Sequence, residues 1–128
     1  MTSLIVKRSI ANYSDTTRSL LAAIERRGLT VFARIDHAAA AREAGLELAE
    51  EEVVLFGNPR GGTPLMLSDR RIGIELPLRI LVWREGAEVL LAYGDPRELS
   101  DIYDIAEHRA TLEQMAKLLA ELTNEAAS

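Results

Sequence analysis

Residues 78 to 93 read LRILVWREGAEVLLAY and predict two consecutive β-strands. Each half, at 78 to 84 and at 87 to 93, is a short run rich in apolar and β-branched residues. Only Glu85 and Gly86 separate the two runs, and glycine accepts the positive φ angles that tight turns need. The stretch therefore predicts a β-hairpin, which places this part of the chain in an antiparallel sheet.

Three further strands are expected before this hairpin. Residues 3 to 9 are short and β-branched, and residues 29 to 36 alternate with a period of two. Residues 52 to 57 form a compact apolar run that leads into a glycine-rich segment. Together with the hairpin, these segments predict a mostly antiparallel sheet of about five strands.

Amphipathic spacing predicts two longer helices, at 15 to 27 and at 107 to 122. Shorter helices are expected in the alanine-rich run before Gly45 and after Thr63-Pro64, where threonine can cap and proline fits the first turn. The order is then β-α-β(4)-α in a single domain over residues 1 to 128. Because two amphipathic helices can cover one apolar sheet face, the sequence predicts an α+β two-layer sandwich with its helices on one face.

The composition argues against several classes of protein. The chain has 20 acidic and 15 basic side chains and a net charge of -5, which disfavours surfaces that bind nucleic acid or anionic membranes. It contains no cysteine, which excludes disulfides and thiolate chemistry. The N-terminal residues show neither a signal-peptide pattern nor a membrane span, so we expect a cytoplasmic protein.

The first candidate site is Asp36-His37, within the stretch FARIDHAAAAREAG at residues 32 to 45. Asp36 stands where a helix is expected to begin, so its carboxylate is suited to cap the first free amides. Alternatively, His37 would stay neutral near a helix N-terminus and could serve as a base or as a ligand. Arg34 lies on the same strand face as Asp36 and can pair with it. Both interpretations, helix cap and functional site, remain open.

The second candidate site is GNPRGGTP at residues 57 to 64, a glycine-rich segment that leads into a helix. Its backbone amides, together with Asn58, Arg60 and Thr63, would suit a small anion. The segment lacks the spacing of a P-loop or a dinucleotide site, so a tight turn stiffened by proline is the alternative. Because the strands that lead into the two candidate sites are consecutive, we expect both sites to border one cleft.

Other catalytic and metal-binding patterns are weak. His37 and His108 lie far apart without an HxxxH or HExxH spacing, so no metal site is expected. Ser9, Ser68 and Ser100 lack the GxSxG context of a catalytic serine. No cofactor is predicted.

Four segments, in this order, resemble the bacterial family called domain of unknown function 302: FARIDHAAAAREAGLEL (32 to 48), LFGNPRGGTPLM (55 to 66), LPLRILVW (76 to 83) and YGDP (93 to 96). The resemblance covers nearly the whole chain. It implies a fold similar to the TATA-binding-protein-like class and a homodimer. The chain departs from the family's pattern at Gly61, where alanine is usual, and at residues 100 to 107. Since the family has no established activity, the resemblance informs the fold and not the function.

These observations leave three functional hypotheses. The first is a cytoplasmic homodimer that binds a small molecule or anion in a cleft lined by Asp36, His37, Asn58, Arg60 and Thr63. The second is an enzyme in which His37 acts as general base on a small anionic substrate held at Arg60. The third is a dimerisation or partner-binding module without a ligand. A polar cavity next to His37 would favour the first two hypotheses over the third.

Overall fold

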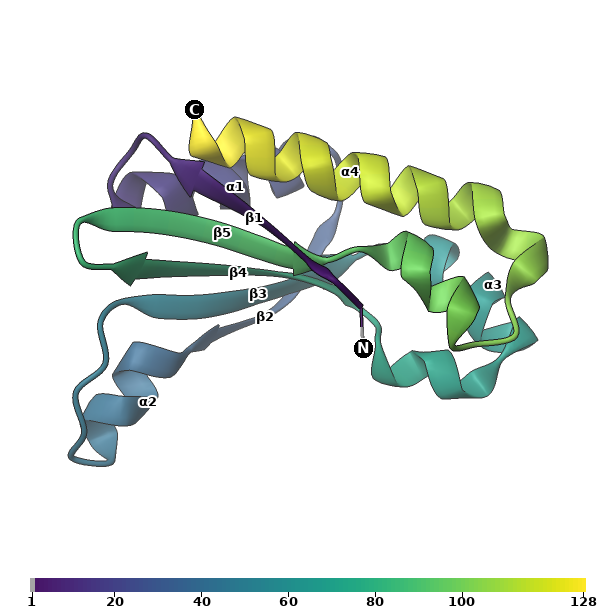
Figure 1. Ribbon diagram of the computed structural model, residues 1–128, viewed down its shortest axis with the longest axis horizontal. Coiled ribbons are helices and arrows are strands. Elements are labelled where there is room, and N and C mark those ends of the chain that lie inside the picture. Colours follow the sequence, from purple (N-terminus) through teal and green to yellow (C-terminus); the bar gives the residue numbers. More distant parts are fainter. Residues whose placement is uncertain (1) are drawn as a thin grey trace.

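A single antiparallel sheet forms the centre of the fold. The computed structural model describes residues 2–128 and orders the strands β1-β5-β4-β3-β2 (Figure 1). The strands are β1 (Leu4–Ser9), β2 (Thr30–Asp36), β3 (Glu51–Gly57), β4 (Leu78–Glu85) and β5 (Glu88–Gly94). Every neighbouring pair is antiparallel, which confirms the predicted hairpin and the predicted sheet. At the turn between β4 and β5, Gly86 has a φ of 62°, a conformation that favours glycine.

Two amphipathic helices, α1 (Tyr13–Arg26) and α4 (Arg109–Ala127), lie side by side on one face of the sheet (Figure 1). Their apolar stripes and the inward strand positions form the main core, which includes Leu20, Ile24, Val54, Phe56, Ile80, Val82, Leu91, Leu119 and Leu122. This arrangement confirms the predicted α+β two-layer sandwich with both long helices on a common face. The last helix begins two residues later than predicted and continues further, to Ala127. No helix within residues 2–128 is long and apolar enough to cross a membrane.

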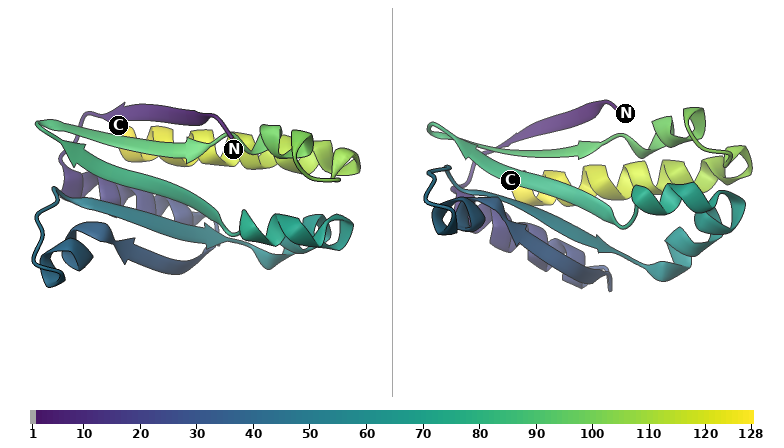
Figure 2. Two further views of the ribbon diagram at one scale, coloured as in Figure 1. Left: turned by 60° about the horizontal axis from the view of Figure 1, so that its bottom comes forward. Right: turned by 90° about the horizontal axis from the view of Figure 1, so that it is seen from below.

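Shorter helical segments extend the molecule beyond the two ends of the strands. They are α2 (His37–Glu43), α3 (Pro59–Ser68) and the 3-10 helices η1 (Arg70–Ile74), η2 (Pro96–Asp101) and η3 (Ala106–His108). α2 lies on the opposite side of the sheet from α4, at one end of the strands, while α3 and η1 lie at the other end (Figure 1; Figure 2).

The glycine-rich segment is mostly helical, although the sequence predicted a loop before Thr63. α3 begins at Pro59, which occupies the first helical position, where a missing amide costs little. Asn58 caps this helix, because its side-chain oxygen accepts a hydrogen bond from the amide of Arg60 at 3.0 Å. The cap and the proline together offset the poor helix propensity of the two glycines that follow.

A second, smaller core fixes α3 beside the first half of α4. Its buried members are Leu65, Ile72, Leu99, Ile105, Leu112 and Met115. Asp69 supports this region, because its carboxylate accepts hydrogen bonds from the amides of Arg71 and Asp104, both at 3.0 Å. The Arg71 guanidinium, which donates to the same carboxylate, holds the pKa of Asp69 well below its usual range. Asp69 therefore ties η1 to the segment that precedes α4.

Candidate functional site

The two candidate sites of the sequence analysis lie at opposite ends of the sheet. β2 and β3 pair so that Asp36 faces Glu52 at one end, while Thr30 faces Gly57 at the other. Six residue steps along an antiparallel strand span about 20 Å. The expectation that both sites border one cleft is therefore wrong. Consecutive antiparallel strands direct their C-terminal ends to opposite edges of the sheet, so chain order alone does not bring these ends together.

Asp36 is the N-cap of α2. Its Oδ1 accepts a hydrogen bond from the amide of Ala39 at 2.8 Å, which confirms the capping interpretation. His37 begins α2 and is exposed to solvent. The sequence analysis expected Arg34 to pair with Asp36, but Arg34 pairs with Glu52 instead. Its Nη2 lies 2.9 Å from Oε1 of the buried Glu52 carboxylate. These contacts assign a structural role to Asp36 and to Arg34.

The amides at the start of α3 are largely used within the helix cap. The backbone oxygen of Asn58 accepts from the amides of Gly61 and Gly62, at 2.9 and 3.3 Å. The Asn58 side chain accepts from the amide of Arg60, whose own side chain is exposed. The anion site predicted at residues 57 to 64 therefore lacks most of the free donors on which it was based.

A cleft of about 500 Å³ lies at this end of the sheet, between α3, α4 and the nearby ends of β2, β3 and β4. Of the residues predicted to line a cleft, Asn58 and Thr63 line this one, whereas Asp36, His37 and Arg60 do not. Its 18 lining residues include no charged side chain. The polar side chains that line it are Asn58, Thr63, Thr111 and Gln114.

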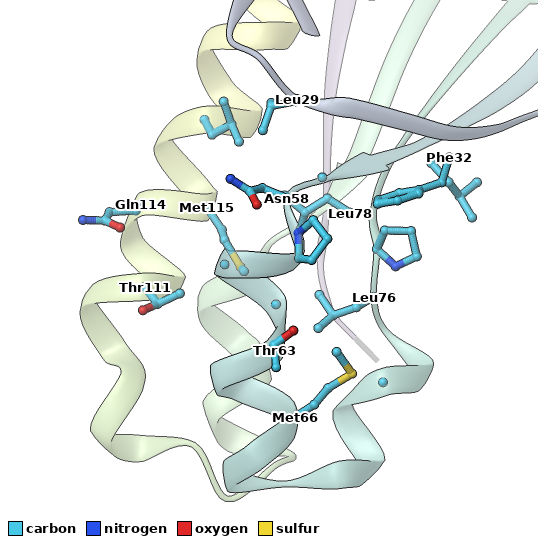
Figure 3. Close-up of a pocket in the computed structure, with 18 residues that line it drawn as sticks. Leu29, Phe32, Asn58, Thr63, Met66, Leu76, Leu78, Thr111, Gln114 and Met115 are labelled. Carbon is cyan, nitrogen blue, oxygen red and sulfur yellow. The ribbon is translucent and has the colours of Figure 1, made fainter. Parts of the chain in front are cut away.

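Figure 3 shows the apolar walls of this α3–α4 cleft. Met115 projects from α4 toward α3, while Phe32 and Leu76 lie on the side of α3 that faces away from α4 (Figure 3). Met66 extends from α3 toward Leu76, and Leu29 closes the cleft near the start of β2 (Figure 3). Such a mainly apolar lining with a few amides and hydroxyls is typical of small-molecule sites.

Three glycines shape the cleft: Gly61 leaves space unfilled, while Gly62 and Gly73 allow neighbouring side chains to approach closely. A Cβ atom at Gly62 would lie 3.4 Å from Leu76 Cδ1, and a Cβ atom at Gly73 would lie 3.4 Å from Met66 Sδ. A Cβ atom at Gly61 would meet nothing within 4 Å. Gly61 therefore borders unfilled space, and a larger side chain at this position would occupy part of the cleft.

A polar cluster of Ser68, Glu107 and His108 lies outside the cleft lining and was not predicted from the sequence. Ser68 Oγ lies 2.7 Å from His108 Nε2 and donates to Glu107 Oε1 at 2.8 Å. The serine hydroxyl has one proton, so it donates to one of these partners at a time, and the tautomer of His108 sets the direction of the Ser68–His108 bond. The cluster joins the end of α3 to the start of α4. No sequence motif links these residues, so only the fold reveals their contact.

Comparison with known proteins identifies a family but no activity. The profile of the family described as "Domain of unknown function DUF302" matches residues 5–122. A solved structure, "uncharacterized conserved protein DUF302 from Bacillus stearothermophilus", superimposes with a TM-score of 0.86 over 96% of this chain and 97% of that one. The two sequences are 15% identical, so this likeness concerns the fold alone.

Curated relatives carry a name of a different kind. The proteins called "Fluoride-specific ion channel FluC 1" from Brucella suis biovar 1 and Brucella abortus biovar 1 are each 39% identical to this chain over 103 residues. The match covers 80% of this chain but only 41% and 38% of those proteins. The chain thus spans about two fifths of the length of the curated relatives it matches.

Proposed function

Since the chain belongs to the DUF302 family, whose description assigns no activity, we propose a function from the α3–α4 cleft: the domain binds a small, uncharged and largely apolar molecule there. The observation that carries this proposal is a cleft of about 500 Å³ without a charged side chain in its lining. Ligand pockets commonly measure about 300 to 1,000 Å³ and are mostly apolar.

The lining also defines the chemistry of the ligand. Transfer of an ion into an uncharged cleft is costly when no opposite charge compensates for its lost hydration. An apolar body can instead contact Phe32, Leu76 and Met115, while a hydroxyl or carbonyl group on the ligand can bond to Thr63 or Gln114. This proposal replaces the small anion of the sequence analysis with a neutral molecule, because Arg60 lies outside the cleft.

The enzymatic alternative finds less support. His37, the general base of that hypothesis, is exposed near the far end of the sheet, about 17 Å along β2 from Phe32 in the cleft lining. It lines neither the cleft nor a second cavity, which lies beside residues 10 to 14. Binding without catalysis is therefore the function that the geometry favours.

Titration with the uncharged dye Nile red tests the proposal. Gly61→Leu should weaken binding of the dye by about tenfold or more, because the new side chain enters unfilled cleft volume. Arg60→Leu is the matched control, since it adds the same side chain at the neighbouring exposed position outside the cleft. The proposal would be overturned if the wild-type protein did not bind the dye, or if Gly61→Leu bound it with the same affinity as the wild type.

The curated relatives favour a second candidate function, that of an accessory module of a membrane channel. In those proteins the matched segment is part of a longer chain named as a fluoride-specific ion channel. If the segment regulates that channel, its deletion from the Brucella suis protein should change fluoride efflux from reconstituted vesicles severalfold. Unchanged efflux would remove this candidate and leave the cleft proposal intact.

A further inference from the structure

The sheet face that points away from α1 and α4 is apolar across its middle. A straight cross-strand row runs over all five strands, and its members are Val6, Ala92, Leu81, Val53 and Ile35. Residues that face each other in neighbouring strands project from the same side of a sheet, so this row forms one band. Val6 is 50% exposed and Ile35 is 44% exposed, and no helix crosses the middle of this face (Figure 2).

This composition is unusual for a solvated sheet face. An antiparallel sheet that is covered on one side alternates apolar inward residues with polar outward ones. Here Val53 and Leu55 project outward from β3 between the inward Val54 and Phe56, and Leu4 beside the band is 70% exposed. A contiguous apolar face of this kind marks a protein interface in many soluble proteins.

The two ends of the same face differ in net charge: Arg79 lies at one end, while Glu51 and Glu85 lie at the other, where Arg8 pairs with Glu88 at 3.2 Å. Arg79 projects outward near the start of β4, and its only side-chain hydrogen bond within residues 2–128 is to the backbone oxygen of Pro77. Glu51 projects outward at the opposite end, beside Trp83. A two-fold axis parallel to the face and perpendicular to the strands would superpose the Arg79 end of one copy on the Glu51 end of the other.

We propose that this open sheet face, defined by the apolar band with Arg79 and Glu51 at its ends, binds a second copy of the same chain. Two identical faces would stack as in a β-sandwich, with the bands in contact and Arg79 of each copy near Glu51 of the other. The dimer does not require a ligand in the α3–α4 cleft.

The size of the face predicts the strength of the dimer. Five strands and about six residues along each give a footprint on the order of 400 Å² per copy. Stable interfaces bury about 800 Å² per partner, so the sheet alone supports a weak dimer. The segment after α2, which lies with α2 on the side of the sheet away from α4 (Figure 1), contains two further exposed apolar residues, Leu46 and Leu48, which are 65% and 44% exposed.

Pairing through the sheet edges is less favourable than stacking of the faces. The β2 edge carries a bulge between Val31 and Ala33, which interrupts the regular register. The β1 edge carries Lys7 and Arg8, and basic residues on edge strands oppose strand addition. These features leave the open face as the surface through which two copies associate.

Sedimentation velocity from about 1 to 500 µM tests the dimer, because this range spans the affinities expected of small interfaces. Val6→Lys should raise the dimer dissociation constant at least about tenfold, since it places two charges in an apolar contact. Ile10→Lys is the matched control, at a residue that is 86% exposed and lies beyond the band, and should leave the constant unchanged. Circular dichroism confirms that both variants fold.

A charge exchange tests the proposed geometry. Arg79→Glu should weaken the dimer, and addition of Glu51→Arg to the same chain should restore it. Trp83 is the only tryptophan and projects from the open face, so its emission should shift to shorter wavelength as the dimer forms. A protein that stays monomeric at about 500 µM would overturn the proposal, and so would a dimer whose dissociation constant is unaffected by Val6→Lys. Binding of the monomer to neutral lipid vesicles in a flotation assay would also overturn it, because the open face would then contact lipid. Nile red binding by Val6→Lys should equal that of wild type, so the dimer and the cleft fail or succeed separately.

Discussion

Replacement of Gly61 by alanine should stabilise the protein, although glycines in ordered proteins usually resist substitution. Gly61 lies in α3, is not among the positive-φ glycines, and a Cβ atom there would meet nothing within 4 Å. Alanine in a helix is favoured over glycine by roughly 0.5 to 1 kcal/mol, and no clash offsets this gain. For a chain of this length, the expected rise in melting temperature is about 2 to 4 °C.

Gly28→Ala is the matched control for this prediction. A Cβ atom at Gly28 would also meet nothing within 4 Å, but Gly28 has a φ of 69°, where alanine is strained. This second substitution should therefore destabilise the protein by about 1 kcal/mol. Urea unfolding followed by circular dichroism measures both changes in free energy. A loss of stability in Gly61→Ala, or equal effects at the two glycines, would refute the open environment assigned to Gly61.

Three further predictions concern other parts of the molecule. Asp36→Ala should lower the free energy of unfolding by about 0.5 to 2 kcal/mol and Asp36→Asn by much less, because asparagine also caps helices; equal losses in urea unfolding would indicate a role for the charge itself. The hydrogen bonds from Arg71 lower the pKa of Asp69 in the folded state, so their contribution is complete above the pKa of the unfolded chain, about 4, and is lost as the pH falls further. Asp69→Asn should therefore reduce the loss of unfolding free energy as the pH falls below about 4. An unchanged pH dependence in this range would contradict the role assigned to Asp69. Nile red affinity should vary less than about twofold between pH 5.5 and 8.5, because no ionisable side chain lines the cleft; a steep pH dependence would reveal a charged contact.

Local patterns in the sequence predict most of the fold. The hairpin at 78 to 93 follows from two apolar runs around Glu85-Gly86, and Asp36 caps α2 where the change from strand to alanine run indicates a helix start. These features depend on neighbours within a few residues, which is the range that periodicity and capping describe. The family resemblance, which the profile match confirms, extends this success to nearly the whole chain.

The candidate site depends on longer-range geometry and was mostly not predicted. Asn58 and Thr63 line a cleft, but it is not the predicted one, because Asp36 and His37 lie at the other end of the antiparallel β2–β3 pair. The cleft walls come from segments that meet only after folding, and none of their apolar residues belongs to a motif. Residue types alone do not distinguish such wall positions from ordinary core positions.

One signal for the open sheet face was present in the sequence. β3 and β4 carry apolar residues at both inward and outward positions, as Val53 beside Val54 and Leu81 beside Val82 illustrate. Strands that are apolar on both sides indicate that both sheet faces are buried. Only one layer of long helices was available to cover them, so this pattern predicts a second apolar face without a helical cover.

Methionine-methyl NMR tests the central claim, that the α3–α4 cleft binds an uncharged apolar molecule, most directly. Met66 and Met115 line the cleft from α3 and from α4, so their ¹³C-labelled methyl groups report from two of its walls. Assignment follows from Met66→Leu and Met115→Leu, which conserve most of the side-chain volume. On titration with Nile red, both resonances should shift in proportion to the bound fraction. Dye that binds while both resonances stay in place would locate the binding site elsewhere and contradict the account.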